Sequence, residues 1–435
     1  MSRVAVIGAG YVGLTTAAWL AHLGHDVCCA DVVVERVESL VRGRVPFVEP
    51  GLEALVGEGL AAGRLRFVLG AAAAVGPPPP EPGPSVEPGP SVVILCLPTP
   101  AAPSGEADMS YVLSAAVEIG PALGPGSIVV NKSTVPVGST RRVAAALGRA
   151  DVAVVSNPEF LREGWALADC ARPDRIVIGS DSADAAREVA ALYGGVDAPV
   201  LITDSASAEL VKYASNAFLA TKLSFVNAVA NLCESVGADI EDVVAGMGYD
   251  HRIGGDYLRP GPGWGGSCFP KDTRALVRMG DRAGYDFDLL ERVIAVNQAQ
   301  QDRVVAKVAA MAGGTLEGVT VAVWGLTFKA RTDDRRGSPA VAIIAAMAAA
   351  GALVRAYDPT VAEPLPEMVV CSDPYAACEG AAVVVVLTEW EEFAALDLAK
   401  AGAVMQRGAM VDARNLFQPA LVRAAGWIYD GIGRL

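Results

Sequence analysis

Residues 1–31 constrain the fold of this chain more than any other stretch. An apolar segment begins at Val4 and runs into Gly8-Ala-Gly-Tyr-Val-Gly13, an apolar helical pattern continues to about Leu23, and a second apolar segment ends on Asp31. A strand, a G-x-G-x-x-G turn, a helix, a strand and an acid in this order are typical of the βαβ unit that binds a dinucleotide. The chain is therefore predicted to begin with a doubly wound α/β domain.

The residue types of this unit also indicate which dinucleotide it binds. We expect Gly8 to make the tight turn, Gly10 to let the backbone approach a pyrophosphate, and Gly13 to let the helix pack on the strand. The helix N-terminus would face the phosphates. Asp31 would accept a hydrogen bond from a ribose 2′-hydroxyl and repel a 2′-phosphate, which favours NAD over NADP. A glycine turn in an unrelated α/β protein is the alternative.

Polar residues follow three further apolar segments, which are predicted strands at 91–97, 127–130 and 152–156. In open α/β sheets, ligands bind beyond the carboxyl ends of the strands. Thr134, Glu159 and Glu163 lie there and are candidate site residues; helix capping and solvated carboxylates are the alternatives. A strand at 175–179 is predicted to be the last of this half. The proline-rich stretch 76–90 is expected to be a surface loop, and no function is assigned to it.

From about Asp204 the pattern becomes helical. Residues 205–237 are predicted to form one long amphipathic helix with Asp204 as its N-cap, and residues 287–311 a second long helix. Lys212 and Asn216 lie four residues apart on a face that is otherwise apolar, so they are either snorkelling surface residues or site groups. We expect this helical section to join two domains or two subunits.

A glycine-rich stretch, Gly261-Pro-Gly-Trp-Gly-Gly-Ser-Cys-Phe-Pro-Lys-Asp272, interrupts the helical section. Its glycines and prolines exclude regular structure, and Pro270 opens a helix predicted to run to about Met279. Cys268 therefore lies just before a helix N-terminus and close to Lys271, a setting that favours the nucleophilic thiolate. A small buried cysteine in a glycine-rich turn is the alternative.

The C-terminal part repeats the order of the first. A strand at 319–324, a loop, a helix and a strand at 353–357 lead to Asp358, which stands where Asp31 stands. This half lacks G-x-G-x-x-G and instead has a cationic segment at 326–336, which suits a different phosphate site. We predict two Rossmann-like α/β domains joined by a central all-helical segment, with bounds at 1–203, 204–312 and 313–435.

Charge and composition exclude several classes of function. The 435 residues include 35 basic and 49 acidic side chains, for a net charge of −14, and no Lys/Arg run offsets this locally. Neither a nucleic acid nor a membrane is therefore an expected partner. The eight cysteines are scattered without a C-x-x-C pair and there are three histidines, so neither a metal site nor a disulfide framework is expected. An N-terminus without a signal-peptide pattern favours the cytoplasm.

Together, these motifs resemble those of the UDP-glucose/GDP-mannose dehydrogenase family, and the resemblance covers essentially the whole chain. They occur in the family's order: Gly8-Ala-Gly-Tyr-Val-Gly-Leu14, Ser133-Thr-Val-Pro-Val-Gly138, Asn157-Pro-Glu-Phe-Leu-Arg-Glu-Gly164, Ala208-Glu-Leu-Val-Lys212, Asn216-Ala-Phe-Leu-Ala220, Gly265-Gly-Ser-Cys-Phe-Pro-Lys-Asp272, and Thr332-Asp-Asp334 with Arg336 and Ser338-Pro339. Three features depart from the family pattern: the proline-rich stretch, Trp264 where relatives usually carry Tyr or Phe, and Gly337 where many carry Glu.

The resemblance implies an NAD-dependent oxidoreductase that converts the C6 alcohol of a nucleotide sugar to an aldehyde and then to an acid, using two NAD⁺. UDP-glucose is the substrate it favours. GDP-mannose or a UDP-N-acetyl-hexosamine is the alternative, and a binding protein without turnover is a weaker one. The second hydride can leave only from a tetrahedral carbon, so Cys268 would form a thiohemiacetal and then a thioester. A single-step hydroxyacid dehydrogenase would leave Cys268 without a purpose.

The resemblance also implies roles for individual residues. Lys212 would stabilise an oxyanion, Asn216 would donate a hydrogen bond, Asp272 would act as a base or hold water, Glu159 would assist thioester hydrolysis, and Thr134 would position a water. Cofactor contacts are expected at Gly8, Gly10, Tyr11, Val12, Gly13, Asp31, Arg36, Thr99, Thr134, Glu163, Lys271 and Arg336. Substrate contacts are expected at Glu159, Phe160, Leu161, Lys212, Asn216, Arg252, Tyr257, Leu258, Gly265, Cys268, Phe328, Lys329 and Arg414. In relatives the arginine at the position of Arg252 reaches the partner's substrate, which implies at least a homodimer formed through the long helices.

Overall fold

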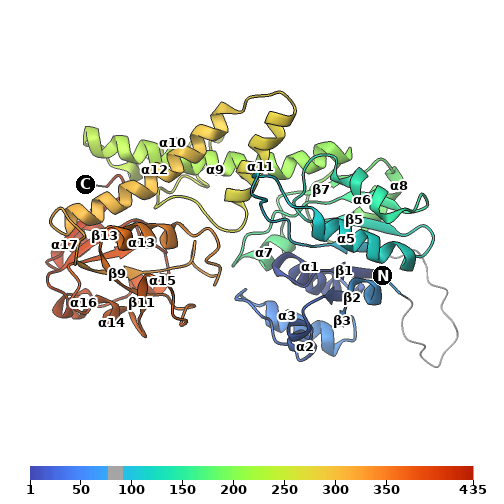
Figure 1. Cartoon of the computed structure of the whole chain (residues 1–435), viewed down its shortest axis with the longest axis horizontal. Helices are drawn as coiled ribbons and strands as arrows, with labels where there is room; N and C mark the ends of the chain where they lie inside the picture. Colours follow the sequence, from blue (N-terminus) through green and yellow to red (C-terminus); the bar gives the residue numbers. More distant parts are fainter. Residues whose placement is uncertain (77–91, 435) are drawn as a thin grey trace. The chain divides into compact units, whose positions relative to one another are not determined.

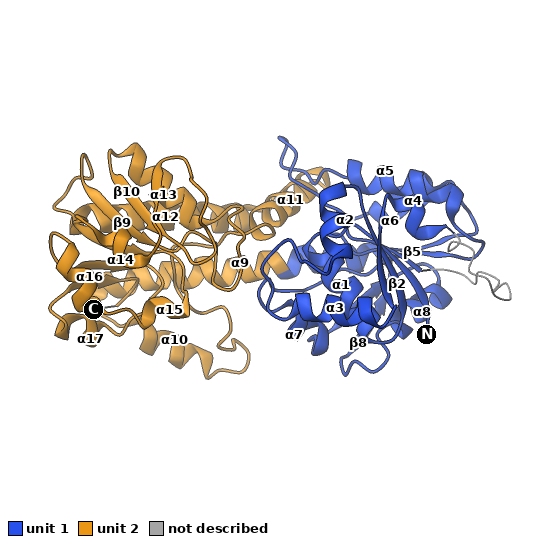
Figure 2. Ribbon diagram, turned by 90° about the horizontal axis from the view of Figure 1, so that it is seen from below, with its two compact units in different colours: residues 1–215 blue, residues 216–435 orange. Residues whose placement is uncertain are grey.

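The computed structural model describes residues 1–76 and 92–434, so the proline-rich stretch lies, apart from Gly76, outside the described residues. The chain divides into two compact units, Met1–Ser215 and Asn216–Leu435 (Figure 2). The long helix α9 (Ser205–Val236) contributes its N-terminal turns to the first unit and the rest to the second. Asp204 precedes it as the N-cap, and its Oδ1 accepts a hydrogen bond from the N–H of Ser207 at 2.8 Å, as predicted.

The first unit is built on an eight-stranded sheet with the strand order β3-β2-β1-β4-β5-β6-β7-β8 (Figure 1). Neighbouring strands are parallel except β6 and β7, which meet in one antiparallel pair, Ser156 with Gly179. The strands are β1 (Arg3–Ile7), β2 (Asp26–Asp31), β3 (Leu65–Leu69), β4 (Val92–Leu95), β5 (Ile128–Asn131), β6 (Ala153–Ser156), β7 (Ile176–Gly179) and β8 (Val200–Thr203).

Helices cover both faces of this sheet, because alternate strand residues point to opposite sides. Val4 and Val6 of β1 pack in one core with α1, α2, α3 and α8, whereas Ala5 and Ile7 pack in another with α4, α5 and α6. The helices are α1 (Tyr11–His22), α2 (Val34–Val41), α3 (Leu52–Ala61), α4 (Ala71–Val75), α5 (Ser110–Ile119), the 3₁₀ turn η1 (Gly120–Ala122), α6 (Ser139–Leu147), α7 (Ala166–Ala171) and α8 (Ala183–Ala191).

The second unit contains a six-stranded parallel sheet with the order β11-β10-β9-β12-β13-β14. This order and that of β3-β2-β1-β4-β5-β6 are the same, and both are the strand order of the Rossmann fold. The prediction of two Rossmann-like α/β domains is therefore confirmed. The strands are β9 (Thr320–Trp324), β10 (Leu353–Tyr357), β11 (Met368–Val370), β12 (Val383–Val386), β13 (Ala409–Asp412) and β14 (Ile428–Gly431).

The helical section packs on one face of this second sheet. Val321 and Val323 of β9 share a core with α13 and with the long helices α9 and α12, while Ala322 and Trp324 pack on the opposite side with Phe393. The central segment α9–α12 is helical, as predicted. The helices that follow α9 are α10 (Ile240–Gly248), α11 (Phe269–Arg282), α12 (Asp288–Met311), α13 (Pro339–Ala349), α14 (Pro374–Cys378), α15 (Glu391–Ala394), α16 (Leu398–Val404) and α17 (Pro419–Ala424).

The two Rossmann units share the same turn after their first strand. Gly8 and Gly325 both have φ +97°. In each unit the acid that ends the second strand accepts a hydrogen bond from the N–H after this glycine, at 2.8 Å for Asp31 and 2.7 Å for Asp358. The correspondence of Asp358 with Asp31 therefore extends to atomic contacts, although the second unit has no G-x-G-x-x-G.

One expectation for the first sheet is wrong. The strand at 175–179 is not the last, because β8 follows it and pairs with β7 at the sheet edge. β8 has four residues, and its Val200, Leu201 and Ile202 are about half exposed. So short an apolar run directly before a helix does not distinguish a strand from a helix start.

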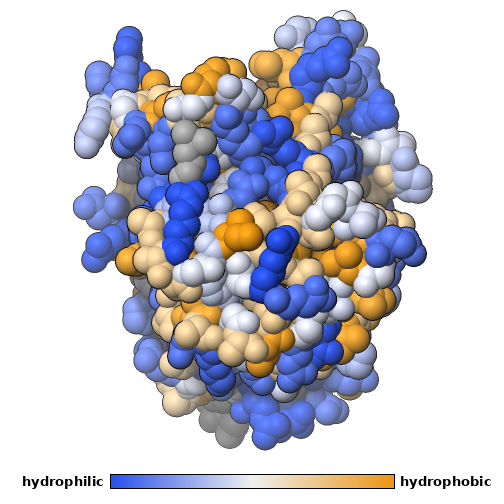
Figure 3. Space-filling model, turned by 90° about the vertical axis from the view of Figure 1, so that its left-hand side faces the viewer, coloured by the Kyte–Doolittle hydropathy of each residue, from blue (hydrophilic) through white to orange (hydrophobic). Residues whose placement is uncertain are grey.

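The surface in Figure 3 shows side chains of mixed polarity, with apolar ones in small groups among hydrophilic ones. Among the described residues, none of the helices combines the length and the hydropathy needed to cross a bilayer.

Candidate active site

The turn between β1 and α1 has the geometry of a dinucleotide cradle. A Cβ atom at Gly8 would overlap the carbonyl oxygen of Cys96, and one at Gly13 would overlap that of Gly8. A Cβ atom at Gly10, by contrast, would meet no other atom within 4 Å, which leaves room for a ligand beside the backbone. Gly10 is also the N-cap of α1, and no side chain in the described part of the chain caps this helix. Its free N–H groups and positive dipole end fit a pyrophosphate.

Asp31 and Arg36 lie together at the end of β2. The Asp31 carboxylate accepts hydrogen bonds from Ala9 N at 2.8 Å, Val33 N at 3.0 Å and Arg36 Nη1 at 2.9 Å. Burial raises the pKa of Asp31, but these hydrogen bonds outweigh it and hold the pKa below its usual value. An ionised acid here fits a ribose hydroxyl, as predicted from the sequence.

A buried carboxylate that sequence reasoning missed, Glu49, links α1 to the loop after β6. Tyr11 donates its hydroxyl hydrogen to Glu49 Oε2, and the same carboxylate accepts hydrogen bonds from Gly164 N at 2.6 Å and Ala166 N at 2.8 Å. The loop that contains Glu163 is thereby held next to the start of α1. Local sequence gives no signal for Glu49, because its partners in that loop are more than a hundred residues away in the chain.

The first unit brings Glu159 and Lys212 into direct contact. Glu159 follows β6, Lys212 lies on α9, and their Oε1 and Nζ atoms are 3.0 Å apart, with each side chain less than 10% exposed. Burial raises the pKa of Glu159, but Lys212, the N–H of Leu161 and Lys132 together hold it below its usual value. Because both side chains are buried in this pair, Lys212 is not a snorkelling surface residue and Glu159 is not a solvated carboxylate. The ring of Phe160 lies nearby, with the Arg175 guanidinium 3.6 Å and Lys212 Nζ 5.3 Å from its centroid.

Thr134 and Thr99 meet where β4 and β5 end. The Thr99 hydroxyl donates to the Thr134 carbonyl oxygen at 2.8 Å, and both residues are buried. Thr134, predicted from its place after a strand, and Thr99, predicted from the family resemblance, are therefore neighbours, as expected for residues that follow adjacent parallel strands.

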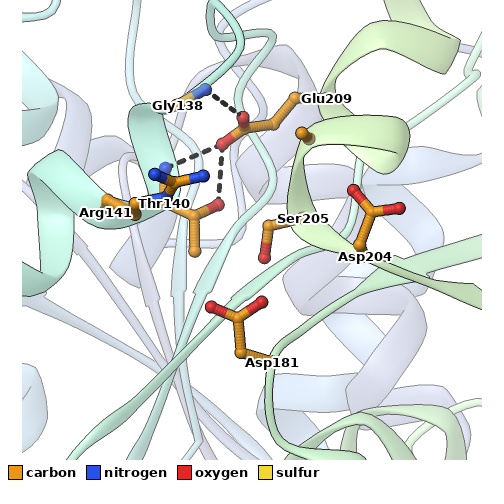
Figure 4. A pocket seen from close by; sticks show the side chains of 8 residues that line it. Gly138, Thr140, Arg141, Asp181, Asp204, Ser205 and Glu209 are labelled. Carbon is orange, nitrogen blue, oxygen red and sulfur yellow. Dashed lines mark hydrogen bonds between the residues drawn. The ribbon is translucent and has the colours of Figure 1, made fainter.

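A small acidic pocket lies between the N-termini of α6 and α9 (Figure 4). It has a volume of about 100 Å³ and includes Asp181, Asp204 and Glu209 in its lining. The Glu209 carboxylate accepts hydrogen bonds from Gly138 N at 2.6 Å and from the N–H of Thr140 at 2.7 Å, so it caps α6. The motif residue Glu209 thus has a structural role: it fixes α9 against α6, one turn before Lys212.

In the second unit, Cys268 is the N-cap of α11, which begins at Phe269 and has Pro270 in its first turn. The predicted helix start is confirmed, and the helix continues three residues beyond the predicted end, to Arg282. The sulfur of Cys268 lies 3.7 Å from the hydroxyl oxygen of Ser267. A cysteine at this end of a helix experiences the positive end of the helix dipole.

Asp272 joins two other predicted site residues. Its side chain is fully buried, and its two oxygens accept hydrogen bonds from Asn216 Nδ2 and from Lys271 Nζ, both at 2.6 Å. The acid therefore fixes the amide of Asn216 and the ammonium of Lys271 within one turn of Cys268.

Buried polar side chains of the long helices hold the glycine-rich stretch. Gly261 is bound at its N–H by Asn227 of α9 and at its carbonyl by Gln300 of α12, at 2.8 and 2.9 Å. The side chain of Asn297 makes a two-way hydrogen-bonded pair with the backbone of Trp264 at 2.7 and 3.0 Å. The Trp264 indole is itself buried and donates to Ser224 Oγ of α9 at 2.9 Å, so this departure from the family pattern is an anchor in the helical core.

The same stretch lies against the second Rossmann domain. A Cβ atom at Gly265 would overlap the carbonyl oxygen of Gly337, and one at Gly266, which has φ +87°, would meet the Phe328 ring at 3.0 Å. Arg414 donates to the carbonyl oxygens of Leu387 and Phe328 at 2.8 and 2.6 Å. The unit therefore brings the predicted residues Gly265, Phe328 and Arg414 to one place, where Gly337 also lies.

Gly265→Ala tests this close approach. The added methyl group has to displace the Gly337 backbone, so we expect a loss of about 1–3 kcal/mol in the free energy of unfolding together with loss of catalytic activity. Denaturant unfolding and initial rates measure the two effects. Gly255→Ala is the matched control, because a Cβ atom there meets nothing within 4 Å and φ is not positive. Equal stability of the two variants would contradict the expectation.

The other predicted residues have different surroundings in the described structure. Arg252 and Arg336 are largely exposed and form bidentate pairs with Asp250 and Asp334 of their own loops. Tyr257 has a left-handed backbone with φ 60°, and its ring lies 6.4 Å from that of Phe269. The side chain of Leu258 belongs to the core beneath the second sheet, and Lys329 Nζ lies 5.4 Å from the Phe328 ring centroid.

Three carboxylates at the start of α12 are close enough to one another to share a cation. They are Asp286, Asp288 and Glu291, whose oxygens lie within 4.8 Å of one another, and all three are exposed. Repulsion from Asp288 raises the pKa of Asp286. They lie outside the clusters described above.

The first unit contains a dinucleotide cradle and a buried Lys–Glu pair, and the second contains a cysteine at a helix N-terminus and another Rossmann domain. These features define a nucleotide-dependent oxidoreductase with two Rossmann domains. Models of the UDP-glucose/GDP-mannose dehydrogenase family match three successive parts of the chain: the NAD binding domain at 2–197, the central domain at 206–299 and the UDP binding domain at 322–419. The chain belongs to this family. The resemblance stated from the motifs is thereby confirmed, as is NAD as the cofactor.

Individual relatives span the whole chain. The UDP-glucose 6-dehydrogenase of Pseudomonas aeruginosa is 44% identical over 453 aligned positions, which cover 99% of this chain and 97% of the relative. A solved UDP-glucose dehydrogenase from Pyrobaculum islandicum superposes with a TM-score of 0.88 at 38% identity and covers 100% of this chain and 98% of its own. A UDP-D-ManNAc dehydrogenase from Pyrococcus horikoshii has a TM-score of 0.86 at 26% identity, with 99% of both chains covered.

Proposed function

We propose that this protein oxidises the C6 alcohol of UDP-glucose to the carboxylate of UDP-glucuronate, with two NAD⁺ per sugar. The observation that carries the proposal is the position of Cys268 at the N-cap of α11, at the end of a glycine-rich stretch that α9 and α12 hold in place. The 44% identical relatives named UDP-glucose 6-dehydrogenase support this substrate over its siblings.

In this mechanism Cys268 acts between two oxidations. NAD⁺, when bound, would supply the hydride acceptor, and the Gly8–Gly13 cradle, Asp31 and Arg36 would hold it. The Cys268 thiolate adds to C6 of the aldehyde and gives a tetrahedral carbon, from which hydride can leave. The resulting thioester is cleaved when water adds to C6 and the thiolate departs, which releases the acid and restores Cys268.

The neighbouring groups suit the charges that develop in these steps. Negative charge forms on the C6 oxygen, and we propose that Lys212 and Asn216 stabilise it, the first by charge and the second by a hydrogen bond. Asp272, which accepts from Asn216, serves as the base or holds water, Glu159 promotes attack of water on the thioester, and Thr134 positions that water. The remaining cofactor and substrate contacts are proposed as the family resemblance implies them.

We also propose a functional division into a cofactor domain at 1–203, a helical dimerisation domain at 204–312 and a nucleotide-sugar domain at 313–435. All eight cysteines are free thiols, which fits a reducing cytoplasm.

The test is the NADH yield of the purified protein with a panel of nucleotide sugars. Two NADH per UDP-glucose, with UDP-glucuronate as the product, is the expected result. Turnover only with GDP-mannose or a UDP-N-acetyl-hexosamine would show that the protein is a dehydrogenase for that other nucleotide sugar. Binding of UDP-glucose without NADH formation would indicate a binding protein.

We propose a homodimer formed through α9. Its C-terminal part exposes Phe218, Phe225 and Leu232, which follow one another at intervals of seven residues, and these side chains are 55–65% exposed in the single chain. A repeat of seven places them on one stripe, as in a helix that packs against a partner.

Phe225→Asp is expected to convert the dimer to a monomer, because a carboxylate would be buried in that stripe. Light scattering coupled to size-exclusion chromatography measures the mass. Leu421→Asp on α17 (Pro419–Ala424) is the comparison, because this side chain is also apolar and 70% exposed but lies outside α9. A monomeric wild-type protein, or a Phe225→Asp variant that stays dimeric, would contradict the proposal.

A further inference from the structure

Lys132 is a buried cation to which the mechanism above gives no role. It follows β5 directly and is 7% exposed. Its Nζ atom lies 3.2 Å from Asn157 Oδ1 and 3.1 Å from the Tyr193 hydroxyl oxygen, and that hydroxyl donates to the same Oδ1 at 2.5 Å. Both partners are neutral. A buried charge is costly unless an opposite charge or a function compensates for it.

Asn157 connects this ammonium to the segment that contains Glu159. Its backbone N–H donates to the carbonyl oxygen of Asn131 of β5 at 3.0 Å, and its side-chain amide donates to that of Val177 of β7 at 2.7 Å. Asn157 therefore fixes the point where β5, β6 and β7 come together, two residues before Glu159. Lys132 Nζ donates to the amide oxygen of the same side chain, Oδ1.

The groups that face Glu159 come from every element packed around it. Lys212 of α9 is in direct contact, Lys132 follows β5, and Arg175 precedes β7. The thiols of Cys96, after β4, and Cys170, on α7, also lie there. Burial raises the pKa of both thiols to about 12, so they are neutral near pH 7. One buried carboxylate is therefore surrounded by several cations.

We propose that Lys132 is a positioning residue that, through Asn157 and its own charge, keeps Glu159 fixed and anionic while Lys212 interacts with the substrate oxyanion. This inference rests on the proposed function, in which Lys212 binds first the Glu159 carboxylate and then the substrate oxyanion. When Lys212 donates to the substrate, Glu159 loses a hydrogen bond at 3.0 Å and would be left as a buried, unpaired carboxylate. Lys132, a second cation in a fixed position, then keeps Glu159 from taking up a proton.

The protonation states of both groups agree with this role. Burial lowers the pKa of Lys132, but Tyr193, Cys96 and Glu159 outweigh it and raise the pKa above the usual value. The Lys132 ammonium is therefore charged at neutral pH. The pKa of Glu159 is lowered in turn, with Lys132 among the causes.

The experiment measures the titration of Glu159 directly and compares it with catalysis. ¹³C-NMR of protein labelled at the glutamate carboxyl carbons, with Glu159 assigned from the signal lost in Glu159→Gln, gives its midpoint without substrate. In Lys132→Met the carboxylate loses a stabilising charge, so its midpoint is expected to rise by about one pH unit. The acid limb of kcat/KM is expected to move to higher pH by the same amount.

Tyr193→Phe is the matched control, since it removes a hydrogen bond from Lys132 and keeps the charge and the ring. It is expected to leave the Glu159 midpoint close to that of the wild type. Lys132→Gln keeps a donor and removes the charge, and it replaces Lys132→Met if that variant does not fold. An unchanged Glu159 midpoint in the charge-neutral variant overturns the inference. The proposed function fails by a separate result, a wild-type protein that gives no NADH from UDP-glucose.

Discussion

Cys268→Ser is expected to lose UDP-glucuronate formation by at least ~10³-fold while it binds UDP-glucose about as tightly as the wild type. A serine hydroxyl at the N-cap of α11 has nearly the same size, so the fold and the hydrogen bonds around Asp272 should persist. An alcohol is far less ionised than a thiol near pH 7, so the serine is a much weaker nucleophile than the thiolate it replaces. Attack on the aldehyde carbon therefore becomes the slow step.

Product analysis, together with calorimetric binding of UDP-glucose, tests this expectation. Cys371→Ser is the matched control, because Cys371 is a free thiol in the second unit and lies beyond β11, outside the proposed site. That variant should oxidise UDP-glucose at the wild-type rate. Acid formation by Cys268→Ser at the wild-type rate would exclude the covalent mechanism and leave only the nucleotide-binding part of the proposal.

Features that depend on neighbouring residues could be predicted from the sequence. The turn at Gly8–Gly13 and the helix start at Pro270 follow from the special backbone conformations of glycine and proline, and both are present in the structure. The N-cap at Asp204 was predictable for the same reason, since a cap bonds to an N–H three residues away. The two Rossmann domains followed from the repeated order of strand, helix, strand and acid.

Features that depend on distant residues were not predictable in this way. Glu49 receives hydrogen bonds from the loop after β6, and no local pattern links residues so far apart. Asn297 and Gln300 on α12 are polar residues on a packed helix, and only the structure shows that they bind the backbone of the glycine-rich stretch. The same holds for Trp264, a departure from the family pattern whose indole the structure shows to be anchored to Ser224.

Lys212→Met is expected to have two effects that a second substitution can separate. Removal of the ammonium leaves Glu159 buried without its nearest opposite charge, so we expect a loss of about 3–5 kcal/mol in the free energy of unfolding at neutral pH. Because the folded-state pKa of Glu159 is lowered, this contribution is present above the usual carboxyl pKa of about 4.3 and is lost as the pH falls through the folded value. Activity should fall about 10²–10³-fold, since an oxyanion donor is lost.

The double variant Lys212→Met/Glu159→Gln distinguishes these effects. It removes the unpaired carboxylate, so most of the lost stability should return, whereas activity should remain low because the variant lacks both the Lys212 ammonium and the Glu159 carboxylate that the mechanism uses. Lys222→Met on the same helix is the matched control: its Nζ bonds only a loop carbonyl, that of Ile253, among the contacts described, and stability should change by less than about 0.5 kcal/mol. Denaturant unfolding at pH 7 and initial rates measure both quantities. Recovery of activity together with stability would mean that Lys212 serves the fold alone, and the oxyanion would then need another donor.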